Sequence, residues 1–99
     1  MTDHQREISE EWLDNEPIRK AVEQAEAHGM SKSDICERLG WTRTRKGKRS
    51  SETSQLDRRI GRRMDAGPHG QRYLSRTIRY DIAVEICRAI NRDPFELGL

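Results

Sequence analysis

The sequence predicts an all-α protein, a small bundle of four to five helices. Apolar residues recur every three or four positions in several separate segments, which is the spacing that places them on one face of a helix. Start and stop signals for helices flank these segments. The chain has 99 residues, of which 32% are hydrophobic, so it can bury one modest core and form one small domain.

An acidic N-terminal segment, residues 1–16, precedes the expected domain at residues 17–99. Ile8 and Trp12 lie one helical turn apart in this segment and predict a short helix that docks on the domain. The sequence contains no apolar run near the roughly 18 residues that cross a bilayer. Its start also lacks the basic and apolar regions of a signal peptide. We expect a cytoplasmic protein with no membrane partner.

The cysteines and histidines favour neither metal binding nor catalysis. Cys36 and Cys87 each fall among apolar residues at helical spacing, as core thiols do. Together with His4, His28 and His69 they do not have the ligand spacing of a zinc site. The sequence shows no Ser/His/Asp arrangement and no glycine-rich phosphate loop. We therefore expect a protein that is not an enzyme, with no catalytic residue, metal, cofactor or small-molecule substrate.

Residues 17–28 predict the first core helix. Acidic groups and Pro17 suit a helix start, and His28-Gly29 suits its end. The apolar residues Ile18, Ala21, Val22 and Ala25 form its buried stripe.

Residues 31–39 predict a second, shorter helix. Ser31 can cap its N-terminus, with Asp34 three residues later in a capping-box position. Gly40 can adopt the positive φ of an abrupt helix end. A short helix that ends on glycine and precedes another helix fits the first element of a helix-turn-helix. We expect the bundle to contain one.

Positive charge is concentrated between residues 42 and 79. This stretch carries twelve Lys/Arg and three Asp/Glu, a net charge of +9. Residues 1–41 carry five Lys/Arg and ten Asp/Glu, and residues 80–99 carry two Lys/Arg and four Asp/Glu. A basic region flanked by acidic ones favours a polyanionic partner, and double-stranded DNA is the first candidate. Residues 42–50 show no strand alternation and predict an extended basic loop, which lies on phosphates, enters a minor groove or stays mobile.

A helix over residues 51–63 should follow this loop, with Leu56, Ile60 and Met64 facing inward. Its outward residues are short polar side chains followed by arginines. In a major groove, Gln pairs with adenine and Arg with guanine, while Ser and Thr hold phosphates. We expect this helix to read the major groove. The predicted DNA-binding residues are Arg43, Arg45, Lys46, Lys48, Arg49, Ser51, Thr53, Ser54, Gln55, Arg58, Arg59, Arg62 and Arg76.

The C-terminal third predicts a turn and a last long helix. Residues 66–70 form a Gly/Pro turn cluster. Residues 77–91 carry an apolar stripe at intervals of four that begins at Ile78. Asp93-Pro94 should end this helix, and Phe95, Leu97 and Leu99 can then form a final apolar turn.

Two segments resemble the lambda-repressor-like, Cro-type helix-turn-helix family. SKSDICERLGW is similar to the first element of that motif, and IRYDIAVEICRAINRDPFELGL is similar to the family's closing helices. The resemblance covers about residues 17–97 and implies a positioning helix at Ser31–Leu39 and a recognition helix at Ser51–Arg63. One departure is the long basic loop, because the family usually has only a few residues between these two helices.

The resemblance implies a sequence-specific transcriptional regulator, a repressor of the bacterial or phage type, acting on the bacterial nucleoid or in a phage-infected host. A homodimer, either free or formed only on DNA, is compatible with the sequence. One alternative is an excisionase-like architectural DNA binder. Another is a protein-binding module such as an antitoxin, which the acidic first third and the apolar C-terminal end would support.

Overall fold

The structure, a computed structural model, describes residues 11–99, and this part of the chain is mixed α/β rather than all-α. The helices are α2 (Glu16–Ala27), α3 (Lys32–Leu39), α4 (Thr53–Arg59), α5 (Tyr80–Ala89) and a 3-10 helix, η1 (Pro94–Leu97). The strands are β1 (Trp12–Asp14), β2 (Thr42–Arg45), β3 (Lys48–Ser51), β4 (Asp65–Ala66), β5 (Arg72–Tyr73) and β6 (Thr77–Arg79). They form three antiparallel pairs, β1 with β6, β2 with β3 and β4 with β5. The predicted all-helical class is therefore wrong.

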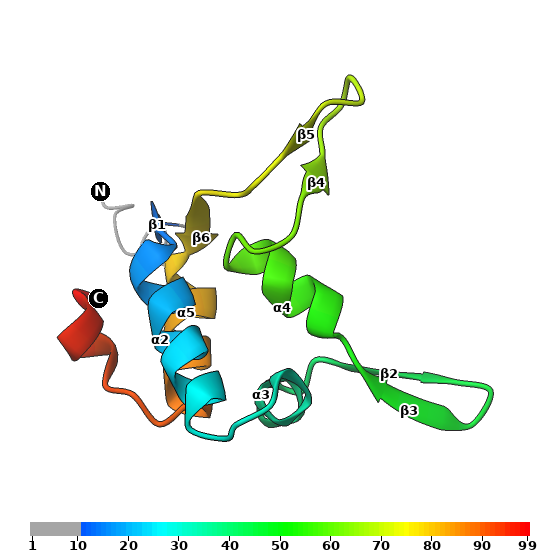
Figure 1. The fold of residues 1–99 in the computed structure, drawn as a ribbon, viewed down its shortest axis with the longest axis horizontal. Helices are drawn as coiled ribbons and strands as arrows, with labels where there is room; N and C mark the ends of the chain where they lie inside the picture. The colour runs from blue at the N-terminus through cyan, green and yellow to red at the C-terminus, as the bar shows by residue number, and fades with distance from the viewer. Residues whose placement is uncertain (1–10) are drawn as a thin grey trace, which may run out of the picture.

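One hydrophobic core holds the helices together. Helix α2 packs against α5, and Figure 1 shows α3 and α4 together on one side of this pair. Ile18, Ile35, Leu56 and Ile86, one from each α-helix, have at most 1% of their surface exposed. Burial of each such side chain stabilises the fold by roughly 1.5–3 kcal/mol relative to exposure. None of the helices in residues 11–99 is long and apolar enough to cross a membrane.

The first two core helices confirm their predictions, because their signals are local. Pro17 stands in the first turn of α2. Ser31 caps α3, accepting from the Asp34 backbone N–H at 3.1 Å while the Asp34 carboxylate accepts from the Ser31 N–H at 3.2 Å. Gly40 then ends the helix at φ +77°, where a residue with a Cβ would be strained.

The basic segment 42–50 was predicted to be a loop, and this prediction is wrong because the segment folds into the β2–β3 hairpin. Lys46 and Gly47 form its two-residue turn, with φ of +53° and +78°. Positive φ at both central positions matches the right-handed twist of the flanking strands. Thr and Arg alternate through β2, which is a two-residue period without apolar residues. The hairpin extends away from the helical body (Figure 1).

The predicted helix over residues 51–63 is shorter than expected. The observed α4 ends at Arg59, and Gly61 has φ +82°. A Cβ at Gly61 would lie 2.5 Å from the Ser75 carbonyl oxygen, so the chain turns where it passes close to the segment that enters β6. Leu56 and Ile60 face the core as predicted, but Met64 lies beyond the helix and is 46% exposed.

The first turn of the predicted C-terminal helix is a strand. Thr77–Arg79 pairs with β1, and α5 begins at Tyr80. The alternation of the pair directs Leu13 and Ile78 toward the core and Trp12 with Arg79 to the opposite face. Trp12 is therefore in a strand and not in the predicted N-terminal helix, and its proposed partner Ile8 lies outside the described residues.

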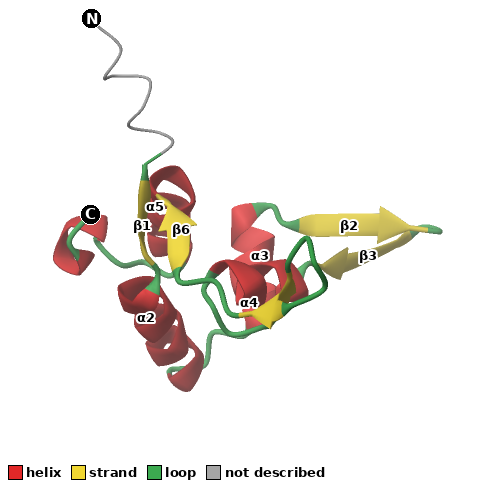
Figure 2. Cartoon of the chain, turned by 90° about the horizontal axis from the view of Figure 1, so that it is seen from above, coloured by secondary structure: helices red, strands yellow, loops and turns green. Residues whose placement is uncertain are grey.

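The turn at residues 66–70 joins β4 to β5, so the structure carries a second hairpin. The two hairpins leave the body in different directions, with α4 between them (Figure 1), and Figure 2 shows β2 and β3 extending away from the helices. At the C-terminus, Leu97 and Leu99 pack against the core as expected, whereas Phe95 is 82% exposed. That apolar turn is thus only partly buried.

Both cysteines are buried free thiols, as predicted. Burial raises the pKa of Cys36 and the pKa of Cys87 because a thiolate would lose its hydration. Both thiols therefore stay protonated at neutral pH and act as small hydrophobic side chains.

Candidate nucleic-acid interface

The β2–β3 hairpin has two chemically different faces. Residues directly opposite one another share a face, so Arg43, Arg45 and Lys48 lie on one and Thr42, Thr44, Arg49 and Ser51 on the other. The second face is tied to α3, since Arg49 pairs with Glu37 at 3.0 Å and the Ser51 hydroxyl lies 3.4 Å from the same carboxylate. The first face is consequently the basic one that points away from α3.

The tip of the hairpin carries the cations with the fewest protein contacts. Arg45, Lys46 and Lys48 are exposed, and no carboxylate of residues 11–99 forms an ion pair with them. Arg45 and Lys48 are directly opposed across the strands, which places two like charges side by side. Such a pair is destabilising until an anion lies between the charges. Nearer the body, Arg43 pairs with Glu52 at 3.0 Å and is less available.

Helix α4 offers a smaller outward surface than the predicted recognition helix. Ser54 and Arg58 are exposed, while Thr53 and Gln55 are half-buried. Ser54 accepts a hydrogen bond from Arg63 at 2.8 Å. In the described part of the chain Arg58 forms no ion pair, so its guanidinium is the one on α4 with most freedom to meet a ligand.

Arg62, a predicted DNA contact, is instead part of an internal ion-pair network. Its guanidinium donates to both Glu26 carboxylate oxygens at 2.7 and 2.8 Å and to Asp57 at 2.8 and 3.1 Å. Its side chain is only 18% exposed. The network joins Asp57 on α4 to Glu26 on α2. Arg62 is therefore not part of the candidate interface.

The electrostatics of this network are those of a structural site. The hydrogen bonds that Arg62 donates to Glu26 raise the pKa of Arg62, whose charge is permanent. Burial by itself raises the pKa of Asp57, but the hydrogen bonds from Lys32 and Arg62 lower it by more, so the pKa lies below its usual value. Lys32 reaches the same carboxylate at 3.0 Å. The carboxylate of Asp57 is thus saturated by partners on α3 and on the segment after α4.

Arg59 and Arg76 are not part of the hairpin surface: Arg59 is the last residue of α4, and Arg76 directly precedes β6. The Arg59 guanidinium is 5.2 Å from the centroid of the Trp41 ring, a cation–π contact that fixes its direction. Arg76 is exposed beside β6, and its backbone carbonyl accepts from the Asn15 N–H at 2.9 Å. Arg76 therefore lies in the segment between β5 and β6, and Arg72 on β5 is also exposed.

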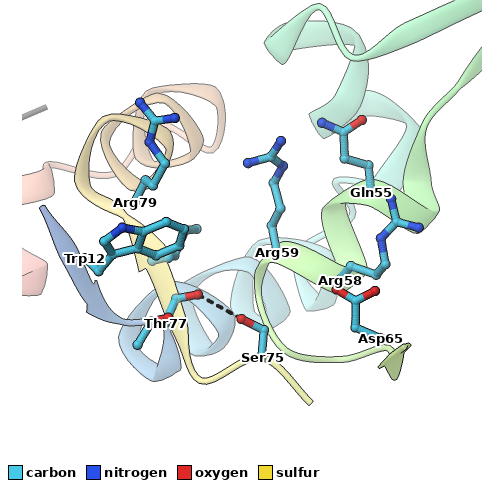
Figure 3. A pocket seen from close by; sticks show the side chains of 9 residues that line it. Trp12, Gln55, Arg58, Arg59, Asp65, Ser75, Thr77 and Arg79 are labelled. Atoms are coloured by element: carbon cyan, nitrogen blue, oxygen red, sulfur yellow. Dashed lines mark hydrogen bonds between the residues drawn. The ribbon is translucent and has the colours of Figure 1, made fainter. Parts of the chain in front are cut away.

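A hollow of about 420 Å³ separates α4 from the β1–β6 pair (Figure 3). We call it the α4–β6 hollow. Its lining includes Trp12, Gln55, Arg58, Arg59, Asp65 and Arg79. Three of these side chains are guanidiniums and one is a carboxylate. Trp12 and Asp65 were not among the predicted site residues.

Comparison of the chain with family models, curated proteins and solved structures finds no match.

Of the predicted site, the structure brings together Arg43, Arg45, Lys46 and Lys48 on the hairpin, and Gln55, Arg58 and Arg59 at the hollow. The sequence did not predict the hollow, because the hollow forms only when β6 pairs with β1, a segment more than 60 residues earlier in the chain. No local signal marked that pairing. Within residues 11–99 no group of three or more His, Cys, Asp or Glu side chains is placed to hold a metal ion.

Proposed function

We propose that this protein binds double-stranded DNA through the β2–β3 hairpin and the exposed side of α4, and that it does so as a transcriptional regulator. The observation that carries the proposal is the hairpin tip, where Arg45, Lys46 and Lys48 gather without carboxylate partners in the described chain. Phosphates along a duplex would supply the counter-charge that this tip lacks.

Size and shape support the same partner. The major groove of B-DNA is about 12 Å wide and accepts a helix or a two-stranded ribbon. Helix α4 has seven residues, a length of roughly 10 Å at about 1.5 Å per residue. The hairpin runs directly into α4, so a duplex that contacts the hairpin would also meet Ser54 and Arg58. In this arrangement the hairpin holds phosphates, and Arg58 is the side chain best suited to pair with guanine.

The test is the salt dependence of duplex binding. We expect affinity for genomic fragments to fall steeply with salt. Replacing Arg45, Lys46 and Lys48 together by Gln should reduce the slope of log affinity against log salt by about 3, since each phosphate contact contributes roughly 0.9. The matched control is Arg88→Gln on α5, which removes an exposed arginine far from the hairpin in sequence.

Footprinting of selected genomic fragments would then separate regulation from architecture. A protected site bound far more tightly than random duplex agrees with a regulator, whereas equal affinity for both favours an excisionase-like architectural role. Failure to bind any duplex at low salt, with a second protein co-purifying instead, would favour the antitoxin-like alternative. The exposed Phe95 of the C-terminal turn is the feature that such a partner would cover.

A further inference from the structure

The α4–β6 hollow combines an aromatic side chain with several cations. Trp12 and Arg79 are register partners across β1 and β6, so both side chains stand on the same outward face of the pair. Trp12 is 60% exposed, although Leu13 beside it packs against the core. Figure 3 shows the indole beside Arg79, at the side of the hollow opposite Gln55. An exposed indole on a strand is a flat platform for another ring.

The cations of the hollow are held in place by contacts outside it. Arg79 pairs with Asp81 at 3.0 Å, and Arg59 lies over the Trp41 ring. In Figure 3 the guanidiniums of Arg59 and Arg79 extend in the same direction from α4 and β6. Two arginines fixed this way lose little side-chain entropy when they bind an anion. Arg58 also lines the hollow, and Asp65 is the one carboxylate in the lining. The lining therefore carries three positive charges and one negative charge.

We propose that the α4–β6 hollow binds a single nucleotide, with the base stacked on Trp12 and the phosphate between Arg59 and Arg79. Base stacking on an aromatic side chain and phosphate binding by arginine are the two contacts that recognise an unpaired nucleotide. Gln55 and Asp65 line the same hollow and supply a donor and acceptors for a base edge. A volume of about 420 Å³ lies in the range of ligand pockets, roughly 300–1,000 Å³.

An inorganic anion would not use the indole, and an apolar ligand would not use the positive charge of the guanidiniums. The nucleotide accounts for both halves of the lining. Its source is either a free mononucleotide or an unstacked nucleotide of a bound strand. This inference does not rest on duplex binding by the hairpin, because the two surfaces share only Arg58.

The test follows the Trp12 indole N–H signal in ¹⁵N–¹H NMR spectra of the full chain, with Trp12→Phe used to assign it. We expect adenosine monophosphate to shift the signal saturably, and inorganic phosphate to bind about tenfold more weakly or worse because it lacks the stacking contact. Arg79→Gln should weaken nucleotide binding about tenfold or more, since a charge-assisted hydrogen bond is lost. The matched control is Arg88→Gln, which should leave affinity unchanged.

Binding of a short single-stranded oligodeoxynucleotide shows whether the bound nucleotide is a free mononucleotide or part of a strand. Tighter binding than the mononucleotide assigns the hollow to a strand, and equal or weaker binding assigns it to a free nucleotide. The inference is overturned if neither ligand shifts the Trp12 signal saturably, if inorganic phosphate binds as tightly as the nucleotide, or if Arg88→Gln weakens binding as much as Arg79→Gln. Arg45→Gln/Lys48→Gln should reduce duplex binding and leave the nucleotide affinity intact, so the two proposals fail separately.

Discussion

Replacing Arg62 by Gln should unfold the protein at a markedly lower temperature without removing a DNA contact. The guanidinium makes four charge-assisted hydrogen bonds, two to Glu26 and two to Asp57, at 2.7 to 3.1 Å. Gln cannot span both carboxylates. The substitution therefore leaves Glu26 without this partner, and Asp57 keeps only the hydrogen bond from Lys32.

The size of the expected loss in stability follows from the burial of Arg62 and Asp57. The side chains of Arg62 and Asp57 are 18% and 16% exposed, so their charges are only partly screened by water. A hydrogen bond to a charged group contributes about 1.5–3 kcal/mol, and removing one partner of a buried pair costs about 3–5 kcal/mol. Because this network is half-buried, we expect a loss of about 3 kcal/mol in the free energy of unfolding. At about 4–8 °C per kcal/mol for a domain of this size, Tm should fall by roughly 12–24 °C.

Circular dichroism during thermal and urea unfolding would measure the change. The control is Arg58→Gln, which makes the same chemical change on an exposed side chain of the same segment. A surface change of this kind should alter stability by less than about 0.5 kcal/mol. Equal Tm values for the two variants would refute the assignment of Arg62 to the internal network. Duplex binding below both transitions should distinguish them in the opposite sense, because only Arg58→Gln should relax the base preference, at a cost of about 1–3 kcal/mol in binding to the preferred site.

Three further results are expected from unfolding measurements. Gly61→Ala should cost about 2–4 kcal/mol, because its Cβ would lie 2.5 Å from a backbone carbonyl at φ +82°, whereas Gly47→Ala meets no atom within 4 Å and should cost only about 1–2 kcal/mol. Asn15→Ala should cost about 2–3 kcal/mol, since this buried amide donates to the Ser75 carbonyl at 2.9 Å; a loss no larger than that of an exposed Asn would contradict this role. The pKa of Asp57 is lowered in the folded state, so the folded protein binds fewer protons than the unfolded chain. The stabilisation by the Asp57 carboxylate is therefore present above about pH 4 and is lost as the pH falls further. Asp57→Asn should be less stable at pH 7, and its stability should lack this part of the acid dependence.

The helices that the sequence predicted correctly carry their signals within a few residues. The capping pair Ser31 and Asp34, the terminating Gly40 and the apolar stripe of α2 lie on the helices they define. The cationic character of residues 42–79 and the burial of both cysteines were also readable, because they depend on composition and periodicity.

The β2–β3 hairpin was not predicted from the local sequence. Lys46-Gly47 is a two-residue turn signal, but the strands around it have no apolar face, so their alternation of Thr and Arg was read as a loop. The partners that hold the second face, Glu37 above all, lie on α3. A strand pair that is fixed by polar contacts to a helix leaves little trace in hydrophobic periodicity.

The sequence by itself determined the core helices α2 and α3, the inward face of α4 and the concentration of positive charge. Only the tertiary structure decided which cations are available, because it placed Arg62 between carboxylates of two elements and left the hairpin tip without them in the described chain. It likewise decided the α4–β6 hollow by joining β1 to β6, next to a buried Asn15 that bonds to a residue 60 positions away. The physical reason is range: capping and periodicity act between neighbours in the chain, whereas ion pairs and strand pairing depend on contacts between distant segments that exist only once the core has formed.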